Sequence, residues 1–264
     1  MKLGKTLLVN SMAVLALGGV GNAQAGLVGL SSGNPGKIYA INAVTGVATQ
    51  LASMAHSTSF VGATFLGGKL YGSDVCDANC FSTGTIDPIT GSYTFVSNQA
   101  GSANWHGLAS DESAGLIYAI DINDGNKLKS MTAAGVVTTI GGGAGIDGRG
   151  LEYDDTNDIL YATGMGGLYT VDVVTGLSTF IGLLGAVSTD RIGLAYDESS
   201  GILYANDSAN LYSVNTGTGA ATLIGSNGVD GIDGLAWQST VPEPGSLALL
   251  GLGLAALARR RRLA

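Results

Sequence analysis

Basic residues and histidine are scarce in this sequence. Between residues 26 and 241 there are 19 acidic residues against 6 basic ones, which gives this region a net charge near −13. A surface of this sign repels phosphate backbones and anionic lipid headgroups, so nucleic-acid binding is not expected. Cations and neutral polar ligands remain compatible with it.

Motifs of catalysis are nearly absent as well. A match to the nucleophile-elbow pattern at Gly29–Gly33 and a match to the dinucleotide-binding pattern at Gly143–Gly148 both lack the following helix that either chemistry needs. Of the two histidines, only His106, beside Trp105, is a candidate acid or base, and the alternative is a role in packing or a turn. The sequence therefore does not indicate an enzyme.

Cysteine is limited to Cys76 and Cys80, which are four residues apart. In an oxidising compartment, two cysteines this close most simply form one local disulfide. A redox or metal role and free thiols are the alternatives, and a metal site would need more ligands nearby.

Amphipathic helical patterns are missing between the two ends of the chain, whereas glycine makes up 43 of the 264 residues without a triplet period. This composition predicts many short strands joined by tight turns.

Three independent markers recur at one period. The first marker is a Gly-Leu pair that opens a short apolar segment, at Gly107-Leu108, Gly150-Leu151, Gly193-Leu194 and Gly234-Leu235, with a weaker copy at Gly62-Ala63. The second marker is a tyrosine in the next segment, at Tyr118, Tyr161 and Tyr204. The third marker is an aliphatic residue, an Asp or Asn, two further residues and then Thr-Gly, at 41–46, 86–91, 171–176 and 214–219. The spacing of about 43 residues is typical of a repeat architecture, and the third marker predicts hairpins capped by the Asx side chain.

Each period contains four predicted strands, as in residues 193–196, 202–205, 211–214 and 221–224. Four strands in 40 to 45 residues is the length of a β-propeller blade. The chain after residue 26 supplies only the last three strands of a blade, and residues 234–237 supply a first strand that is followed only by residues 238–240 and the C-terminal segment 241–264. We therefore expect an all-β, five-bladed propeller with four-stranded blades, closed by pairing of the N- and C-terminal strands.

Polar residues recur in the loops that join consecutive blades, on the face where propellers usually bind ligands. The candidate ligand-binding residues are Asn104, His106, Asp147, Arg149, Asp190, Asp230 and Asp233. Their oxygens would suit a divalent cation such as Ca²⁺, or the hydroxyl groups of a glycan. The alternative is that tight turns favour Asp and Asn. No other cofactor is indicated.

The last 24 residues contain three parts in a fixed order: Pro242, Glu243 and Pro244; an uncharged run over 245–258; and four arginines, Arg259, Arg260, Arg261 and Arg262. A helix over the run would be roughly 21 Å long, which is short for a permanent membrane span. The arrangement resembles the PEP-CTERM sorting signal of Gram-negative bacteria. The resemblance implies that a membrane-embedded exosortase recognises the tripeptide, while the short transmembrane helix and the arginines present it. The alternative is an ordinary membrane anchor.

The N-terminus predicts export too. Lys2 and Lys5 precede an apolar run, and the pattern formed by Ala23, Gln24 and Ala25 predicts cleavage by signal peptidase after Ala25. The expected organisation is a signal peptide at 1–25, a propeller domain at 26–240 and a sorting signal at 241–264, with both signals helical.

These observations predict an exported protein, held briefly at the inner membrane and then released to the cell surface or extracellular matrix. Proteins with such a signal tend to come from bacteria that make exopolysaccharide and biofilm, so the expected role is a binding or matrix module. Its expected partners are exosortase, signal peptidase and the membrane, together with an exopolysaccharide or another envelope protein. The alternatives are a polysaccharide hydrolase or lyase acting on the propeller rim, and a structural envelope protein without a ligand.

Overall fold

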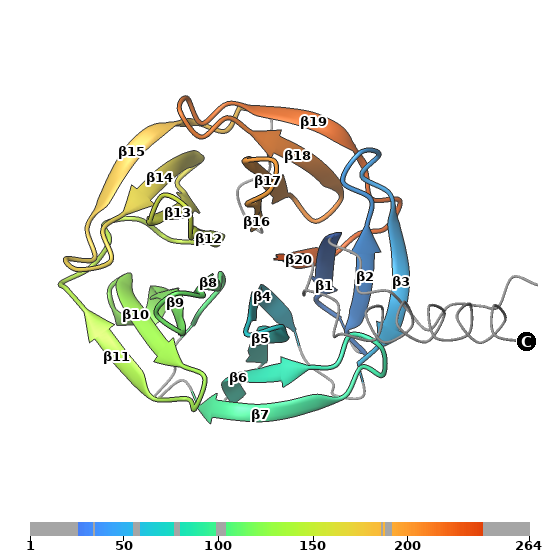
Figure 1. Ribbon diagram of the computed structural model, residues 1–264, viewed down its shortest axis with the longest axis horizontal. Coiled ribbons are helices and arrows are strands. Elements are labelled where there is room, and N and C mark those ends of the chain that lie inside the picture. The colour runs from blue at the N-terminus through green and yellow to red at the C-terminus, as the bar shows by residue number, and fades with distance from the viewer. Residues whose placement is uncertain are drawn as a thin grey trace, which may run out of the picture.

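The computed structural model describes residues 26–33, 35–54, 59–76, 80–98, 104–185, 187 and 192–239. Over these ranges the chain forms five sheets of four antiparallel strands, arranged as blades around one axis (Figure 1). The predicted five-bladed propeller is thereby confirmed. The predicted signal peptide and sorting signal, and their helices, lie outside the described residues.

We number the blades from the first complete one and give their strands from the axis outward. Blade 1 has β4 (Phe60–Leu66), β5 (Lys69–Cys76), β6 (Cys80–Ile86) and β7 (Tyr93–Asn98). Blade 2 has β8 (Ala109–Asp111), β9 (Leu116–Asp121), β10 (Lys127–Thr132) and β11 (Val137–Ile140), with the 3₁₀ helix η1 (Ile122–Asp124) after β9. Blade 3 has β12 (Leu151–Asp154), β13 (Ile159–Gly164), β14 (Gly167–Val171) and β15 (Ser178–Leu183). Blade 4 has β16 (Gly193–Asp197), β17 (Ile202–Asn206), β18 (Asn210–Val214) and β19 (Ala221–Ser226).

Blade 5 closes the ring with strands from both ends of the chain. Its innermost strand is β20 (Ile232–Gln238), and β1 (Gly26–Ser31), β2 (Lys37–Ile41) and β3 (Ala48–Ser53) follow outward. The register pairs Gly26 with Gln238 and Leu27 with Trp237. The predicted closure is therefore confirmed, and it leaves no unpaired edge between the first and last blades.

The Gly-Leu marker lies on the inner strands or at their start, where neighbouring blades approach the axis. A Cβ atom placed on Gly193 would lie 2.7 Å from the backbone nitrogen of Leu235, and one on Gly107 would lie 2.6 Å from that of Leu151. The leucine that follows each glycine is buried. The glycines thus let adjacent inner strands touch, and the leucines fill the space between blades.

The tyrosine marker joins consecutive blades. Tyr118 lies with its ring centroid 5.8 Å from that of Tyr153 in the next blade, and Tyr204 stacks on Trp237 at 5.8 Å. A third pair, Tyr161 and Tyr196, follows the same pattern at 6.4 Å. Each pair buries apolar area between two sheets.

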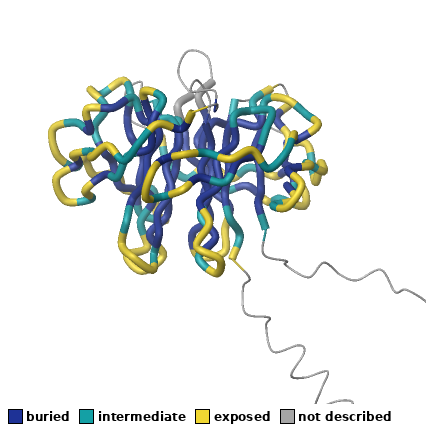
Figure 2. Tube along the Cα trace, turned by 90° about the horizontal axis from the view of Figure 1, so that it is seen from above, coloured by how far each residue is buried: buried dark blue, intermediate teal, exposed yellow. Residues whose placement is uncertain are grey.

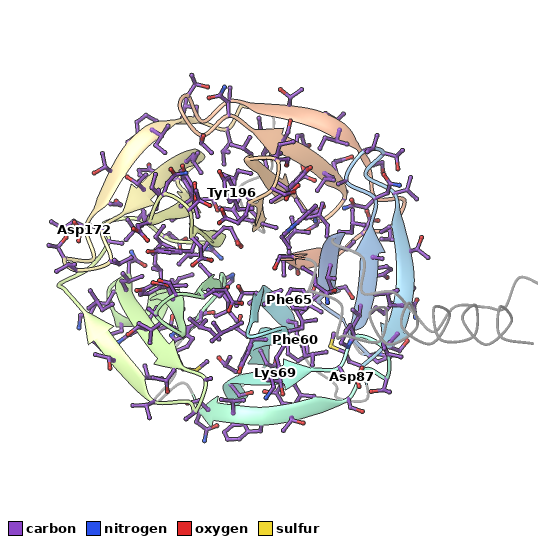
Figure 3. All side chains as sticks on the ribbon, viewed as in Figure 1. Phe60, Phe65, Lys69, Asp87, Asp172 and Tyr196 are labelled. Atoms are coloured by element: carbon purple, nitrogen blue, oxygen red, sulfur yellow. The ribbon has the colours of Figure 1, made fainter. Side chains whose placement is uncertain are left out.

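The third marker forms the hairpins between the third and outer strands. In blade 3, the Oδ1 atom of Asp172 accepts hydrogen bonds from the backbone N–H groups of Val174 and Thr175, and Gly176 follows with a φ of 73°. Figure 3 places Asp172 and its counterpart Asp87 at the periphery of the ring. The glycine of each hairpin also faces the outer strand of the preceding blade, so that a Cβ atom placed on Gly219 would lie 2.6 Å from the carbonyl oxygen of Gly182.

Candidate functional site

Two faces of the ring follow from the antiparallel order of the strands. The upper rim consists of the loops between second and third strands and of the loops that join one blade to the next. The lower face consists of the turns between first and second strands and the hairpins between third and outer strands, together with the end of β20 and the start of β1. Figure 2 shows the buried inner strands in the middle of the ring, with the exposed segments at its loops and circumference.

The axis itself is almost filled. The ring glycines and the residues beside them line a space of about 130 Å³, a value that includes open solvent at its mouth. Sites for small organic ligands usually occupy about 300–1,000 Å³. A ligand on this face would therefore have to lie on the upper rim and not inside the axis.

His106, Asp147 and Arg149 come together on the upper rim beside the axis. Nε and Nη2 of Arg149 donate to Oδ2 of Asp147 at 3.1 and 2.7 Å. Nη1 of Arg149 lies 3.3 Å from Nδ1 of His106. His106 belongs to the loop that leads into blade 2, and Arg149 belongs to the loop that leads into blade 3. His106 and Arg149 are 43 residues apart and each precedes a ring glycine, so the repeat places them side by side. Asp147 fixes the guanidinium of Arg149 in one orientation beside the imidazole of His106.

The neighbouring carboxylates of the upper rim are bound to local partners. Asp124 accepts from Nζ of Lys127 at 2.8 Å and from Nζ of Lys129 at 2.6 Å, and these two ammonium groups lower the pKa of Asp124 to about 2. Asp121 caps η1 and accepts from the backbone N–H groups of Asn104 and Asn123.

The other predicted rim residues lie apart from this cluster. The Oδ1 atom of Asn104 is buried without a hydrogen-bond partner. Asp233 is buried and accepts from the hydroxyl of Ser208 at 2.7 Å, which ties blade 5 to blade 4, whereas Asp230 is exposed. Asp190 lies outside the described residues.

Within the described ranges, no three His, Cys, Asp or Glu side chains are arranged so that they could bind one metal ion. Of the candidate carboxylates, Asp147 pairs with Arg149, Asp233 accepts from the hydroxyl of Ser208 and Asp230 is exposed. This arrangement gives the calcium hypothesis no support from the described part of the chain.

The disulfide remains a prediction. The register of β5 and β6 places Cys76 directly opposite Cys80, but both side chains lie outside what the structure describes.

A series of carboxylates on the lower face was not anticipated. Glu112 accepts from the N–H of Gly67, Asp155 from the N–H of Glu112, and Glu198 from the N–H of Asp155, so that each links its blade to the preceding one. The acidic pairs Asp111-Glu112, Asp154-Asp155 and Asp197-Glu198 repeat every 43 residues. The same period could have revealed them.

Two acidic groups of this face have raised pKa values. Burial, together with the charges of Asp111 and Glu198, raises the pKa of Asp155 to about 6. Glu152 is buried in β12, and burial, reinforced by Asp155 and Glu198, raises its pKa well above the usual range. Its Oε2 atom has no hydrogen-bond partner.

At the C-terminal end, residues 240–262 match the PEP-CTERM protein-sorting motif. The chain carries a PEP-CTERM sorting signal. This signal identifies an exported protein that an exosortase sorts to the cell surface in Gram-negative bacteria. The motif begins two residues after β20 ends, at the lower face. Among the described residues, no helix is long and apolar enough to cross a membrane.

Comparison with other proteins adds only the fold. Among curated proteins, none matches this sequence. A structure titled as a nidogen/laminin complex is similar with a TM-score of 0.59 and 13% identity, over 83% of this chain and 100% of that one. A structural-genomics protein of unknown function from Bacteroides thetaiotaomicron has a TM-score of 0.50 and 16% identity, over 74% of this chain and 57% of that one.

Proposed function

We propose that this exported, exosortase-sorted protein is a binding module of the extracellular matrix, whose upper rim binds exopolysaccharide through Arg149 and His106. The observation that carries the proposal is the position of this cluster. The two chain ends leave together at the lower face, where Gly26 pairs with Gln238. A protein held by its sorting signal would therefore turn the upper rim outward.

The chemistry of the cluster supports a polysaccharide ligand. A guanidinium fixed by a carboxylate presents its remaining N–H donors in a rigid plane, and sugar hydroxyl oxygens accept such bonds. The nearly filled axis favours a long ligand lying across the rim over a small molecule enclosed in a pocket. The nidogen/laminin structure, in which the same fold belongs to a protein complex, supports a binding role by analogy of fold alone.

The test is co-sedimentation of the exported protein with exopolysaccharide purified from the producing strain, with dextran as a control polymer. We expect saturable binding that Arg149→Gln weakens and Lys69→Gln leaves unchanged. Lys69 provides the matched control because it is an exposed base at the start of β5, directly after the turn between β4 and β5 on the lower face. Equal binding by both variants, or no saturable binding by the parent, would contradict the proposal.

The second candidate is a polysaccharide hydrolase or lyase that uses the same rim. The contact between His106 and Arg149 favours it, because an imidazole beside a guanidinium could serve as acid or base next to a bound anionic or polar group. The same exopolysaccharide decides between the two: release of reducing or unsaturated ends, lost in His106→Ala, would establish the enzyme, whereas binding without product favours the module.

The transient membrane stage is tested separately by the intact mass of the exported protein. We expect a chain that begins at Gly26 and lacks Arg259–Arg262. A mass that includes the four arginines would contradict processing at the sorting signal.

A further inference from the structure

The basic side chains of the propeller gather at one end of the ring. Of the five basic residues that the structure describes between residues 26 and 241, Lys69 lies on the lower face. The other four lie in the upper rim or in the first residues of the strands that leave it: Lys37, Lys127, Lys129 and Arg149. This distribution would suit an acidic polysaccharide only if these bases kept a net positive charge, which depends on their partners.

Arg149 and its partners form a neutral cluster. Its Nε and Nη2 atoms donate to Oδ2 of Asp147 at 3.1 and 2.7 Å, which balances the charge of the guanidinium. A guanidinium has no acceptor atom, so in its contact of 3.3 Å with His106 the Nδ1 atom of the imidazole accepts. A protonated imidazole could not accept there, and His106 therefore adds no charge to the cluster.

The two lysines of blade 2 are neutralised in the same way. Nζ of Lys127 and Nζ of Lys129 bind Asp124 at 2.8 and 2.6 Å, and Nζ of Lys129 also lies 3.9 Å from Oδ2 of Asp121. Two ammonium groups thus face two carboxylates. Together with the pair formed by Arg149, the described rim of blades 2 and 3 has as many acidic as basic groups.

The rim of blades 4 and 5 is acidic. Its described part has Asp207, Asp230 and Asp233 against one base, Lys37. Because the axis is nearly filled, a long ligand has to lie across the rim, and a polymer that extends from Arg149 across the axis passes over these carboxylates. An acidic polymer would meet like charges there, which costs free energy, whereas an uncharged polymer would not.

Hydrogen-bonding chemistry favours the same ligand. The guanidinium of Arg149 only donates hydrogen bonds, and the exposed carboxylate of Asp230 only accepts them. A sugar hydroxyl does both, whereas a carboxylate on the ligand only accepts and finds no donor in Asp230. We propose that the upper rim selects an uncharged, hydroxyl-rich polysaccharide and discriminates against polymers that contain carboxylates. This inference rests on the proposed function and names the class of polymer that the site takes.

The experiment compares charge forms of one polymer, the exopolysaccharide purified from the producing strain. Reduction of its carboxyl groups to alcohols gives an uncharged form, and oxidation of its primary hydroxyl groups gives a carboxylated form; both keep the glycosidic linkages. Co-sedimentation with the exported protein measures both affinities at about 0.02 M and about 0.3 M NaCl, where screening lengths differ several-fold. We expect the reduced form to bind about tenfold or more tightly than the oxidised form at low salt, and the difference to shrink at high salt.

The matched variants are Asp230→Asn on the upper rim and Asp158→Asn on the lower face, which each remove one exposed carboxylate. Asp230→Asn should strengthen binding of the oxidised form by about twofold or more at low salt, and Asp158→Asn should leave it nearly unchanged. Four results would overturn the inference and leave the binding role standing: tighter binding of the oxidised form, equal binding of both forms, affinity for the oxidised form that falls as salt rises, or equal effects of the two variants. No saturable binding of any form would instead refute the proposed function itself.

Discussion

Replacing Gly193 by alanine tests whether the ring glycines set the diameter of the propeller. The added Cβ would lie 2.7 Å from the backbone nitrogen and from Cβ of Leu235, and 3.0 Å from the carbonyl oxygen of Asp233. Contacts below 3.0 Å require atoms to move, and here backbone atoms must move because they belong to the neighbouring inner strand. The strand cannot shift alone, since it also pairs with β1.

The expected cost follows from overpacking. Inserting a methyl group into a packed interior typically costs about 1–3 kcal/mol, and we expect the upper part of this range at Gly193 because its neighbours are backbone. For a domain of this size, each kcal/mol lowers Tm by about 2–4 °C. Gly193→Ala should therefore lower Tm by roughly 5–10 °C. Gly234→Ala should cost less, because its nearest neighbours would lie at 3.1 and 3.2 Å.

The matched control is Gly142→Ala. No atom lies within 4 Å of a Cβ at that position, and its backbone is not in the left-handed region. There we expect no loss, or a gain of about 0.4–1 kcal/mol from the reduced entropy of the unfolded chain. The assay is urea unfolding monitored by tryptophan fluorescence, with thermal unfolding as a second measure. Equal effects of Gly193→Ala and Gly142→Ala would refute the packing explanation.

Three further predictions concern the lower face, the closing blade and the hairpins. Burial raises the pKa values of Glu152 and Asp155, so their protonated forms favour the folded state. The free energy of unfolding should therefore fall as pH rises from about 4 through 6, the range between the unfolded and folded pKa values of Asp155. Glu152→Gln should make this fall less steep in urea titrations at a series of pH values, and an unchanged slope would contradict the explanation. Ser208→Ala should destabilise the fold by about 1 kcal/mol or more, because buried Asp233 loses the hydroxyl donor of Ser208. The comparison is Ser199→Ala, which removes an exposed hydroxyl that donates to Asp197 on the lower face; equal losses in urea unfolding would contradict a special cost at Asp233. Gly176→Ala should lower Tm more than Gly115→Ala, because both glycines have positive φ but only Gly176 packs against another blade; equal losses would show that φ alone decides.

The strands and their order could be read from the sequence because the period constrains them. Each marker position recurs in at least three blades, so a blade in which one marker is missing is identified by the other markers. The close contacts of Gly107 and Gly193 could not be read, because a Gly-Leu pair at the start of a strand also fits an ordinary turn. Only the distance between neighbouring blades shows why alanine is excluded.

The candidate site was predicted less well than the fold. The period correctly placed His106 and Arg149 on one rim, because it fixes the height of each residue along the axis. It does not fix which partner a side chain binds. Asp147 therefore pairs with Arg149 and Asp233 accepts from Ser208, although both were candidates for binding one cation.

The two expected processing sites lie next to the strands that close the ring. Predicted cleavage after Ala25 leaves Gly26 as the first residue, and Gly26 is the register partner of Gln238 at the end of β20. The sorting motif begins at residue 240, after that pair. Cleavage at these two places would therefore fall just outside the closing sheet and would remove none of its ladder hydrogen bonds. Closure needs β20, which follows every other strand in the chain, so the ring can be completed only when all the other strands are present. Loss of the sorting signal would then leave the closed ring intact.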